Sequence, residues 1–197
     1  MRKLIVCNIM SLDGYVAGPG DNVMVLPMDP AFDAYNLERL RAADTLLLGR
    51  TTYDGFRGFW PSVADDPDFT ATHWEISRRD DAIDKVVVSD SISEAETKPW
   101  QATTRIVRRA DAHEQVAELK QQDGKEILVF GSHVLWNDLL AHGLVDELHL
   151  MVGAVVLGAG TPAFQGEPPV SLRLIDARKL EGSETLLVRY EVGRKAE

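Results

Sequence analysis

The chain has 197 residues, of which 45% are hydrophobic, and a formal net charge of −10 at pH 7. This length predicts one domain over residues 1–197, large enough to bury a sizeable core. The acidic balance argues against nucleic acid as a partner, because phosphate backbones are repelled. No apolar run approaches the ~20 residues of a membrane span, so we expect a cytoplasmic protein without a membrane partner.

The single cysteine, Cys7, lies inside the first apolar run. One cysteine excludes a disulfide or a cysteine-based zinc site within one chain, and no metal site is predicted. We expect Cys7 to behave as a small buried hydrophobe.

The first half of the chain alternates apolar strands with helices. Residues 3–10 predict a strand, and residues 11–28 a loop rich in glycine, aspartate and proline. Asp29 and Pro30 are typical of a helix start, as N-cap and first helical residue. The further elements expected here are strands at 45–48, 85–88 and 104–107 and a helical turn at 51–56, whereas 57–80 shows no clear pattern.

The second half continues this alternation and ends in a hairpin. Asp111 and Glu114 resemble a capping box before a helix that runs to about residue 122. The strand at 127–130 stops at a glycine, and a helix over 132–141 follows, with a serine as N-cap. The last elements expected are a strand at 145–152 and a hairpin with Gly182 in its turn. Together the elements predict an α/β fold: a mixed, mostly parallel central sheet, helices on both faces, and a C-terminal antiparallel hairpin.

Two segments share one plan, in which an apolar strand ends in glycine and a helix begins at once. Gly49 precedes the Arg-Thr-Thr of residues 50–52, and Gly131 precedes Ser132 and His133. Glycine lets the backbone approach a ligand closely, and a helix N-terminus offers free N–H donors. One such turn is most often only a tight connection. The pair, with an arginine in one of them, favours a phosphate-bearing cofactor.

Motifs of several other enzyme classes are missing or broken. The chain has no Walker GK[ST] sequence and no GxSxG elbow. His113 and Glu114 begin like the HExxH motif, but position 117 is alanine, which excludes a zinc protease of that type.

The chain resembles the dihydrofolate reductase superfamily, in the branch similar to the reductase domain of the bifunctional riboflavin-biosynthesis deaminase/reductase. The resemblance covers nearly the whole chain and is carried by SLDG at 11–14 with Gly18, LLLGRTTYDGF at 46–56, ILVFG at 127–131 and GLVDELHLMVGAVVLGAGTPAF at 143–164. It implies a reductase that transfers hydride from NADPH to a small heterocycle. The nominal substrate is 5-amino-6-(5-phosphoribosylamino)uracil, of riboflavin biosynthesis, and a dihydrofolate or pterin substrate is the alternative.

The resemblance also implies which residues hold the cofactor. The first turn places Gly49, Arg50, Thr51 and Thr52 at its phosphates. The second turn offers N–H groups to the pyrophosphate from Gly131, Ser132, His133 and Val134. Ser89, after the third strand, matches the family's contact near the adenosine 2′-phosphate.

Two carboxylates are candidates for handling the proton. Asp33 matches the family's carboxylate in its spacing to Gly49, and its alternative role is to complement the helix dipole. Asp13 is implied to lie beside the cofactor, and its alternative role is an Asp-Gly turn. The family usually has two glycines joined by a cis peptide where this chain has Gly131-Ser132. A trans peptide there would weaken the phosphate-site argument.

The roles of three aromatic residues and one alternative to the reductase stay open. Tyr35, Trp60 and Trp74 are candidates to stack on a flat substrate, with core packing as the alternative for each. A non-catalytic nucleotide- or pterin-binding protein would keep the cleft without a working proton donor. The zinc-dependent deaminase domain of the riboflavin enzyme is not expected, because only one cysteine is present, and the reductase is expected to be a homodimer.

Overall fold

The computed structural model describes residues 1–166, 168 and 170–194. The strands of its main sheet are β1 (Leu4–Ser11), β3 (Ala43–Gly49), β4 (Asp84–Val88), β5 (Thr104–Val107), β6 (Glu126–Phe130), β7 (Glu147–Gly153), β9 (Val170–Lys179) and β10 (Leu186–Arg194). The helices are α1 (Pro30–Ala42), α2 (Arg50–Val63), α3 (Ala71–Ala82), α4 (Ala112–Gln121) and α5 (His133–Ala141). None of these described helices has the length and apolarity needed to cross a membrane.

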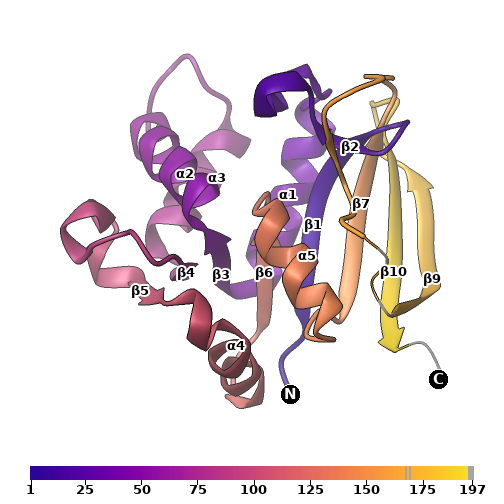
Figure 1. Cartoon of the computed structure of the whole chain (residues 1–197). Helices are drawn as coiled ribbons and strands as arrows, with labels where there is room; N and C mark the ends of the chain where they lie inside the picture. Colours follow the sequence, from indigo (N-terminus) through magenta and orange to yellow (C-terminus); the bar gives the residue numbers. More distant parts are fainter. Residues whose placement is uncertain (167, 169, 195–197) are drawn as a thin grey trace.

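The main sheet has eight strands in the order β5-β4-β3-β6-β1-β7-β10-β9 (Figure 1). Every pair from β5 to β7 is parallel, and β10 pairs antiparallel with both β7 and β9. The mixed, mostly parallel sheet with a C-terminal hairpin is therefore confirmed. Because β1 and β3 to β7 run in one direction, their carboxyl ends lie along one edge of the sheet.

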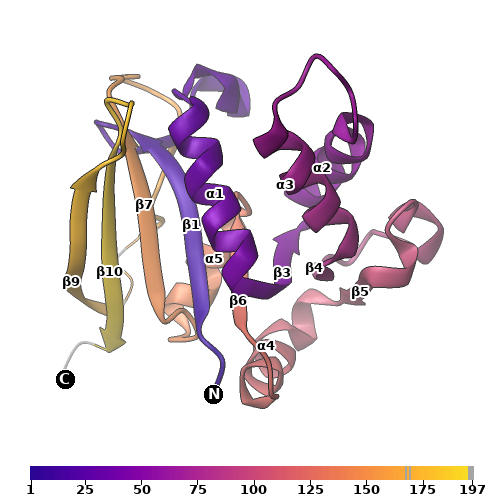
Figure 2. The same cartoon turned by 180° about the vertical axis from the view of Figure 1, so that it is seen from behind.

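Two apolar cores pack on the two faces of this sheet. In β1, Ile5 and Cys7 belong to the core that includes side chains of α1, α2 and α3, whereas Leu4 and Val6 belong to the core with α4 and α5. This alternation follows from the two-residue period of a strand. Figure 1 shows α5 in front of the sheet, and Figure 2 shows α1 on the opposite face. Helices cover both faces, as predicted.

Cys7 is buried, as expected, and is a free thiol. Burial raises the pKa of the thiol to about 12. The nucleophilic thiolate form is therefore scarce at neutral pH, and Cys7 acts as a packing residue.

Local capping signals mark some helix ends correctly and others not. The Asp29 carboxylate accepts the N–H groups of Ala31 and Phe32, so the predicted N-cap of α1 is confirmed. The capping box predicted at Asp111 is wrong: this residue precedes α4, but its side chain makes no cap hydrogen bond. The segment without a clear pattern, 57–80, contains the end of α2 and most of α3, whose capping box begins at Thr70.

A small second sheet joins two loops at the carboxyl edge of the main sheet. It pairs β2 (Tyr15–Ala17), within the predicted loop, with β8 (Thr161–Pro162). A Cβ atom on Gly160 would lie only 2.0 Å from the carbonyl oxygen of Ala17, so only glycine fits there. The two loops are thus held closely together.

Candidate functional site

The two glycine turns lie side by side because β3 and β6 are neighbours in the sheet. The N–H of Gly49 donates to Oγ of Ser132 over 3.0 Å, and the N–H of Ser132 donates to Oγ1 of Thr52 over 2.8 Å. Each turn therefore supplies a donor to the other. The turns, 80 residues apart in the chain, form one rigid unit at the carboxyl edge of the sheet.

The backbone of the second turn is left-handed at two consecutive residues. Gly131 has φ +49° and Ser132 φ +50°. A Cβ atom on Gly131 would meet Oγ1 of Thr52 at 2.8 Å, so glycine is required on steric grounds as well. Ser132 lies at the predicted N-cap position of α5, but the side-chain hydrogen bond expected of an N-cap is not formed. Its hydroxyl serves Gly49 on the neighbouring strand instead.

The peptide between Gly131 and Ser132 is trans, since Lys98–Pro99 is the one cis peptide among the residues that the structure describes. The chain therefore departs from the family's cis Gly-Gly arrangement in conformation as well as in sequence. The family's cis peptide therefore cannot be used as evidence for a phosphate site in this chain. The evidence for such a site has to come from the geometry of α5 itself.

The N-terminus of α5 is open to solvent. Val134 is 64% exposed, and Gly131 is also exposed. The N–H of Trp136 is bonded to the carbonyl of Ser132, so the N–H groups of the preceding helical residues lie before the first helical bond. Such a helix start fits an anionic group. The His133 ring turns inward against Trp136, with ring centroids 6.0 Å apart, so only the backbone of His133 is suited to this role.

Arg50 lies at the start of α2, beside the first turn, but its guanidinium is already paired. Nη2 lies 2.7 Å from Glu96 and Nε lies 3.1 Å from Asp54, and Nη1 donates to Ser91 over 3.3 Å. The bonds to Glu96 and Asp54 raise the pKa of Arg50. A phosphate at Arg50 would have to displace at least one carboxylate. Thr51, the next residue, is exposed.

Ser89 is 2% exposed and shapes the turn after β4. Its Oγ accepts the N–H groups of Ser91 and Ile92, each over 3.2 Å. The guanidinium of Arg108 donates to the carbonyl oxygens of Ser89 and Ile92 on the same turn. The predicted contact of Ser89 with a 2′-phosphate stays a prediction, and any such contact requires this turn to rearrange.

Asp13 fastens the loop after β1 to the loop after β7. Its carboxylate accepts the N–H groups of Leu157 over 3.1 Å and of Gly158 over 2.7 Å. A hydrogen bond from Ser11, and then these two, hold the pKa of Asp13 at about 2. Asp13 is thus an exposed anion at neutral pH, suited to tying loops together and poorly suited to donating a proton.

Asp33 pairs with a histidine that the sequence did not single out. Its Oδ2 lies 3.0 Å from Nε2 of His73 on α3, while Nδ1 of His73 lies 2.9 Å from Oγ1 of Thr70. Burial raises the pKa of the Asp33 carboxyl, and His73 opposes part of this shift. The rings of Phe69 and Trp60 lie 5.6 and 6.5 Å from that of His73, by centroid. The pair is therefore a carboxyl–imidazole dyad at the edge of an aromatic cluster.

The predicted stacking residues differ in their surroundings. Tyr35 is 3% exposed, and its hydroxyl lies 2.7 Å from Nδ1 of His149, so it belongs to the core. Trp60 is half-buried and packs against Phe59, with centroids 5.0 Å apart. Trp74 is half-buried, and its indole N–H donates a hydrogen bond to the backbone carbonyl oxygen of Asp66. Of the three, Trp60 is the one whose ring packs against the ring of His73.

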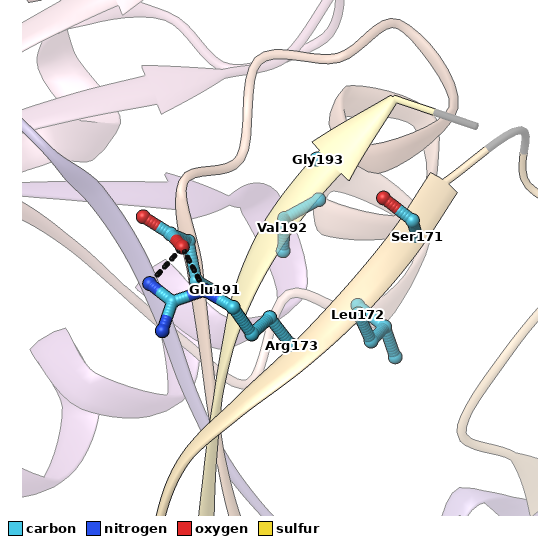
Figure 3. A pocket seen from close by; sticks show the side chains of 6 residues that line it. All are labelled: Ser171, Leu172, Arg173, Glu191, Val192 and Gly193. Atoms are coloured by element: carbon cyan, nitrogen blue, oxygen red, sulfur yellow. Dashed lines mark hydrogen bonds and ion pairs between the residues drawn. The ribbon is translucent and has the colours of Figure 1, made fainter. Parts of the chain in front are cut away.

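A separate hollow of about 490 Å³ lies on the C-terminal hairpin (Figure 3). Its walls come from β9 and β10, and an ion pair between Arg173 and Glu191 crosses it. Strands β1 and β7 separate this hairpin from β6, so the hollow is not part of the site at the glycine turns.

Solved structures define the class of fold. A putative riboflavin biosynthesis protein from Shewanella sp. PV-4 superposes with a TM-score of 0.67 at 22% identity, covering 98% of this chain and 99% of that one. Dihydrofolate reductase from Enterococcus faecalis, complexed with NADP(H), gives a TM-score of 0.58 at 13% identity, with 99% and 97% covered. The dihydrofolate-reductase-like fold is therefore confirmed.

The chain belongs to the RibD C-terminal domain family, whose model matches residues 2–188. The uncharacterized protein YyaP of Bacillus subtilis is 28% identical over 190 residues, which cover 96% of this chain and 95% of YyaP. The resemblance to the riboflavin-reductase branch is thus confirmed, and family membership supports an oxidoreductase.

Proposed function

We propose that this protein is an NADPH-dependent reductase that transfers hydride to a small heterocycle, nominally 5-amino-6-(5-phosphoribosylamino)uracil. The observation that carries the proposal is the reciprocal bonding of the two glycine turns through Ser132 and Thr52. It fixes an exposed helix start and an arginine at one edge of a parallel sheet, where α/β proteins bind nucleotides. The bound NADP(H) of the similar dihydrofolate reductase supports the choice of cofactor.

The residues of the two turns fit a dinucleotide. Backbone N–H groups at the start of α5 would take the pyrophosphate, and Arg50 would take a further phosphate by exchanging Glu96 or Asp54 for it. When bound, NADPH supplies the hydride. The role of this chain is to hold and orient the cofactor and substrate, and to provide the proton that accompanies reduction.

Asp33 is the proton donor that we propose. Its raised pKa keeps more of the acid form near neutral pH than a solvated aspartate has. His73 holds the carboxyl in place and connects it to Thr70. Asp13, with its pKa of about 2, serves instead to hold the loops that border the site.

NADPH titration followed by turnover with a panel of pyrimidines and pterins tests the proposal. We expect Asp33→Asn to lower kcat by about 10²–10⁴-fold while NADPH affinity is unchanged. Asp68→Asn, at an exposed carboxyl outside the site, is the matched control and should behave as the parent. If the protein does not bind NADPH at millimolar concentration, the proposal is refuted.

Arg50 and Glu96 allow a sharper test of the cofactor site. Arg50→Ala should weaken NADPH binding, whereas Glu96→Gln should strengthen it, because the variant removes the anion that competes for the guanidinium. If Arg50 only anchors the loop after β4, both variants will lower affinity or neither will change it.

A non-catalytic binder of nucleotides or pterins is the second candidate. The trans peptide before Ser132 and the paired state of Arg50 favour it, because both depart from an open phosphate site. Such a protein would bind NADPH or a pterin and show no oxidation with any member of the panel. NADPH oxidation above background that is lost in Asp33→Asn excludes it.

We also propose a homodimer, formed through the exposed edge strand β9. Leu172 is 43% exposed and Leu174 is 53% exposed on this strand, and an edge strand has unpaired backbone groups to offer. Light scattering after gel filtration should give twice the chain mass, and Leu174→Glu should give the mass of one chain. A parent protein of single-chain mass at ~100 µM would refute the dimer.

A further inference from the structure

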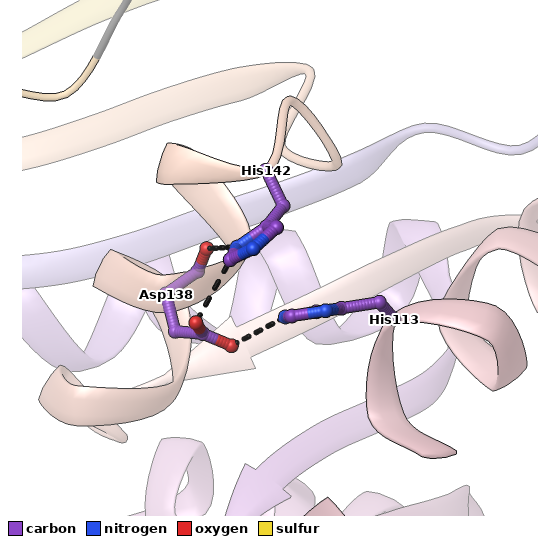
Figure 4. Close-up of side chains that lie close together, drawn as sticks. All are labelled: His113, Asp138 and His142. Carbon is purple, nitrogen blue, oxygen red and sulfur yellow. Dashed lines mark hydrogen bonds and ion pairs between the residues drawn. The ribbon is translucent and has the colours of Figure 1, made fainter. Parts of the chain in front are cut away.

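Three side chains with metal-binding atoms meet on the surface between α4 and α5. His113 lies in the first turn of α4, Asp138 lies on α5, and His142 follows the last residue of α5. One candidate ligand atom from each lies within 4.8 Å of the other two. Figure 4 shows the His113 ring reaching the Asp138 carboxylate from α4, and the His142 ring reaching it from the end of α5, the helix that carries Asp138. The cluster lies at the C-terminal end of α5, whereas the two glycine turns lie at its N-terminal end. The two ends are about 13 Å apart along the helix axis.

The candidate ligand atoms are close enough for side-chain movements to bring them to the spacing of a tetrahedral metal site. Nε2 of His113 lies 2.7 Å from Oδ2 of Asp138, and Nδ1 of His142 lies 3.4 Å from Oδ1. Ligands about 2.0–2.2 Å from a tetrahedral ion are ~3.3–3.6 Å apart. The two contacts end on different oxygens of Asp138, and the two rings are stacked with their centroids 3.8 Å apart. Both rings therefore have to turn as well as shift to bring their nitrogens and one oxygen around a single ion. All three side chains are 42–50% exposed, so such movements meet little resistance.

The donor set indicates which ion fits. Two imidazole nitrogens with one carboxylate oxygen suit zinc and the neighbouring late transition metals, whereas Ca²⁺ and Mg²⁺ prefer oxygen alone. Three protein ligands leave a position for water. The net charge of −10 raises the local concentration of cations around the chain.

We propose that His113, Asp138 and His142 form a binding site for Zn²⁺ or a similar late first-row divalent ion. The ion would replace the His113–Asp138 hydrogen bond with two coordinate bonds. It would also displace the 2.8 Å contact between Nδ1 of His142 and the carbonyl oxygen of Asp138. It would join the start of α4 to the end of α5, the helix whose first turn borders the proposed cofactor site. No metal site is predicted from the sequence, because the ligands meet only when the two helices pack.

Calorimetric titration of the tag-free chain with Zn²⁺, in the absence of NADPH, tests this site. We expect one Zn²⁺ per chain, with affinity lowered at least ~10-fold in His113→Gln, His142→Gln and Asp138→Asn. Glu114→Gln, beside His113 and outside the cluster, is the control and should bind as the parent does. Mg²⁺ should give no binding heat at the same concentration.

Two further measurements distinguish a metal site from a cluster held only by the His113–Asp138 hydrogen bond. Zn²⁺ should raise the unfolding temperature of the parent by several degrees and leave that of His142→Gln unchanged. Co²⁺ should give visible d–d absorption with the parent only, which reports coordination directly. The proposal is overturned if the parent binds no Zn²⁺ at ~100 µM, or if the three ligand variants bind it as tightly as the parent. Far-ultraviolet circular dichroism establishes that each variant is folded.

Discussion

Ser132 permits a test that isolates the strain of a left-handed residue from the loss of its hydrogen bond. Ser132→Ala removes the acceptor of the Gly49 N–H, which costs about 1 kcal/mol for a partly buried bond, and keeps φ near +50°. Ser132→Gly loses the same bond, but glycine adopts positive φ without the ~1 kcal/mol that alanine requires. We therefore expect the glycine variant to be more stable than the alanine variant by about 1 kcal/mol.

Urea unfolding at equal m-value measures this difference. The same pair of substitutions at Ser62, inside α2 with ordinary helical backbone, should give the reverse order, with glycine about 1 kcal/mol less stable than alanine. If Ser132→Gly is no more stable than Ser132→Ala, the backbone strain inferred at this turn is wrong. NADPH titration of both variants then shows whether the bond between the turns matters for the cofactor.

Three further outcomes concern buried groups and one tight contact. Burial raises the pKa of Asp80 to about 8, so the folded state holds its proton more tightly than the unfolded state. Between about pH 6.5 and 8 stability should therefore fall by ~1.4 kcal/mol per pH unit, and Asp80→Asn should flatten this slope in urea titrations. Burial lowers the pKa of His149 to about 4, so the contribution of His149 to stability rises with pH between about 4 and 6.5 and offsets the contribution of Asp80; His149→Gln should therefore make stability fall with pH over this range. The two slopes oppose each other below pH 6.5, so the Asp80 slope is read above it; an unchanged slope in either variant contradicts its assignment. Gly160→Ala should lower stability by on the order of 2 kcal/mol and abolish hydrogen-exchange protection in β2, because its Cβ would overlap the carbonyl oxygen of Ala17.

Strands and capped helix starts could be predicted from the sequence because their signals are local. The strand at 104–107 and the N-cap at Asp29 agree with the structure, and both depend on a few consecutive residues. The sequence predicts only the first half of α2, because Gly58 and Pro61 in its second half are poor helix formers. Its burial of Tyr53 and Val63 against the core overrides that preference.

The candidate site could be predicted only in part, because its side chains find partners across elements. The paired glycine turns follow from local motifs and from the neighbouring positions of β3 and β6. The contact of Asp33 with His73 joins α1 to α3, and no local spacing marks it. In the same way, the Ser132 hydroxyl looks like an N-cap in sequence and instead binds Gly49. Sequence signals identify turns, and tertiary packing decides which groups the polar atoms reach.

The fastening of two loops by Asp13 and by the β2–β8 pair has a mechanical consequence. The loops leave the sheet at Ser11 and Gly153, which face each other as partners on neighbouring strands. They therefore share one hinge line and behave as a double-stranded flap rather than as two independent loops. Because the two loops are bonded to each other, any movement of one has to carry the other with it. In the proposed reductase, stiffening the chain at Ser11 and Gly153 should slow ligand binding and release together and leave the rate of hydride transfer unchanged.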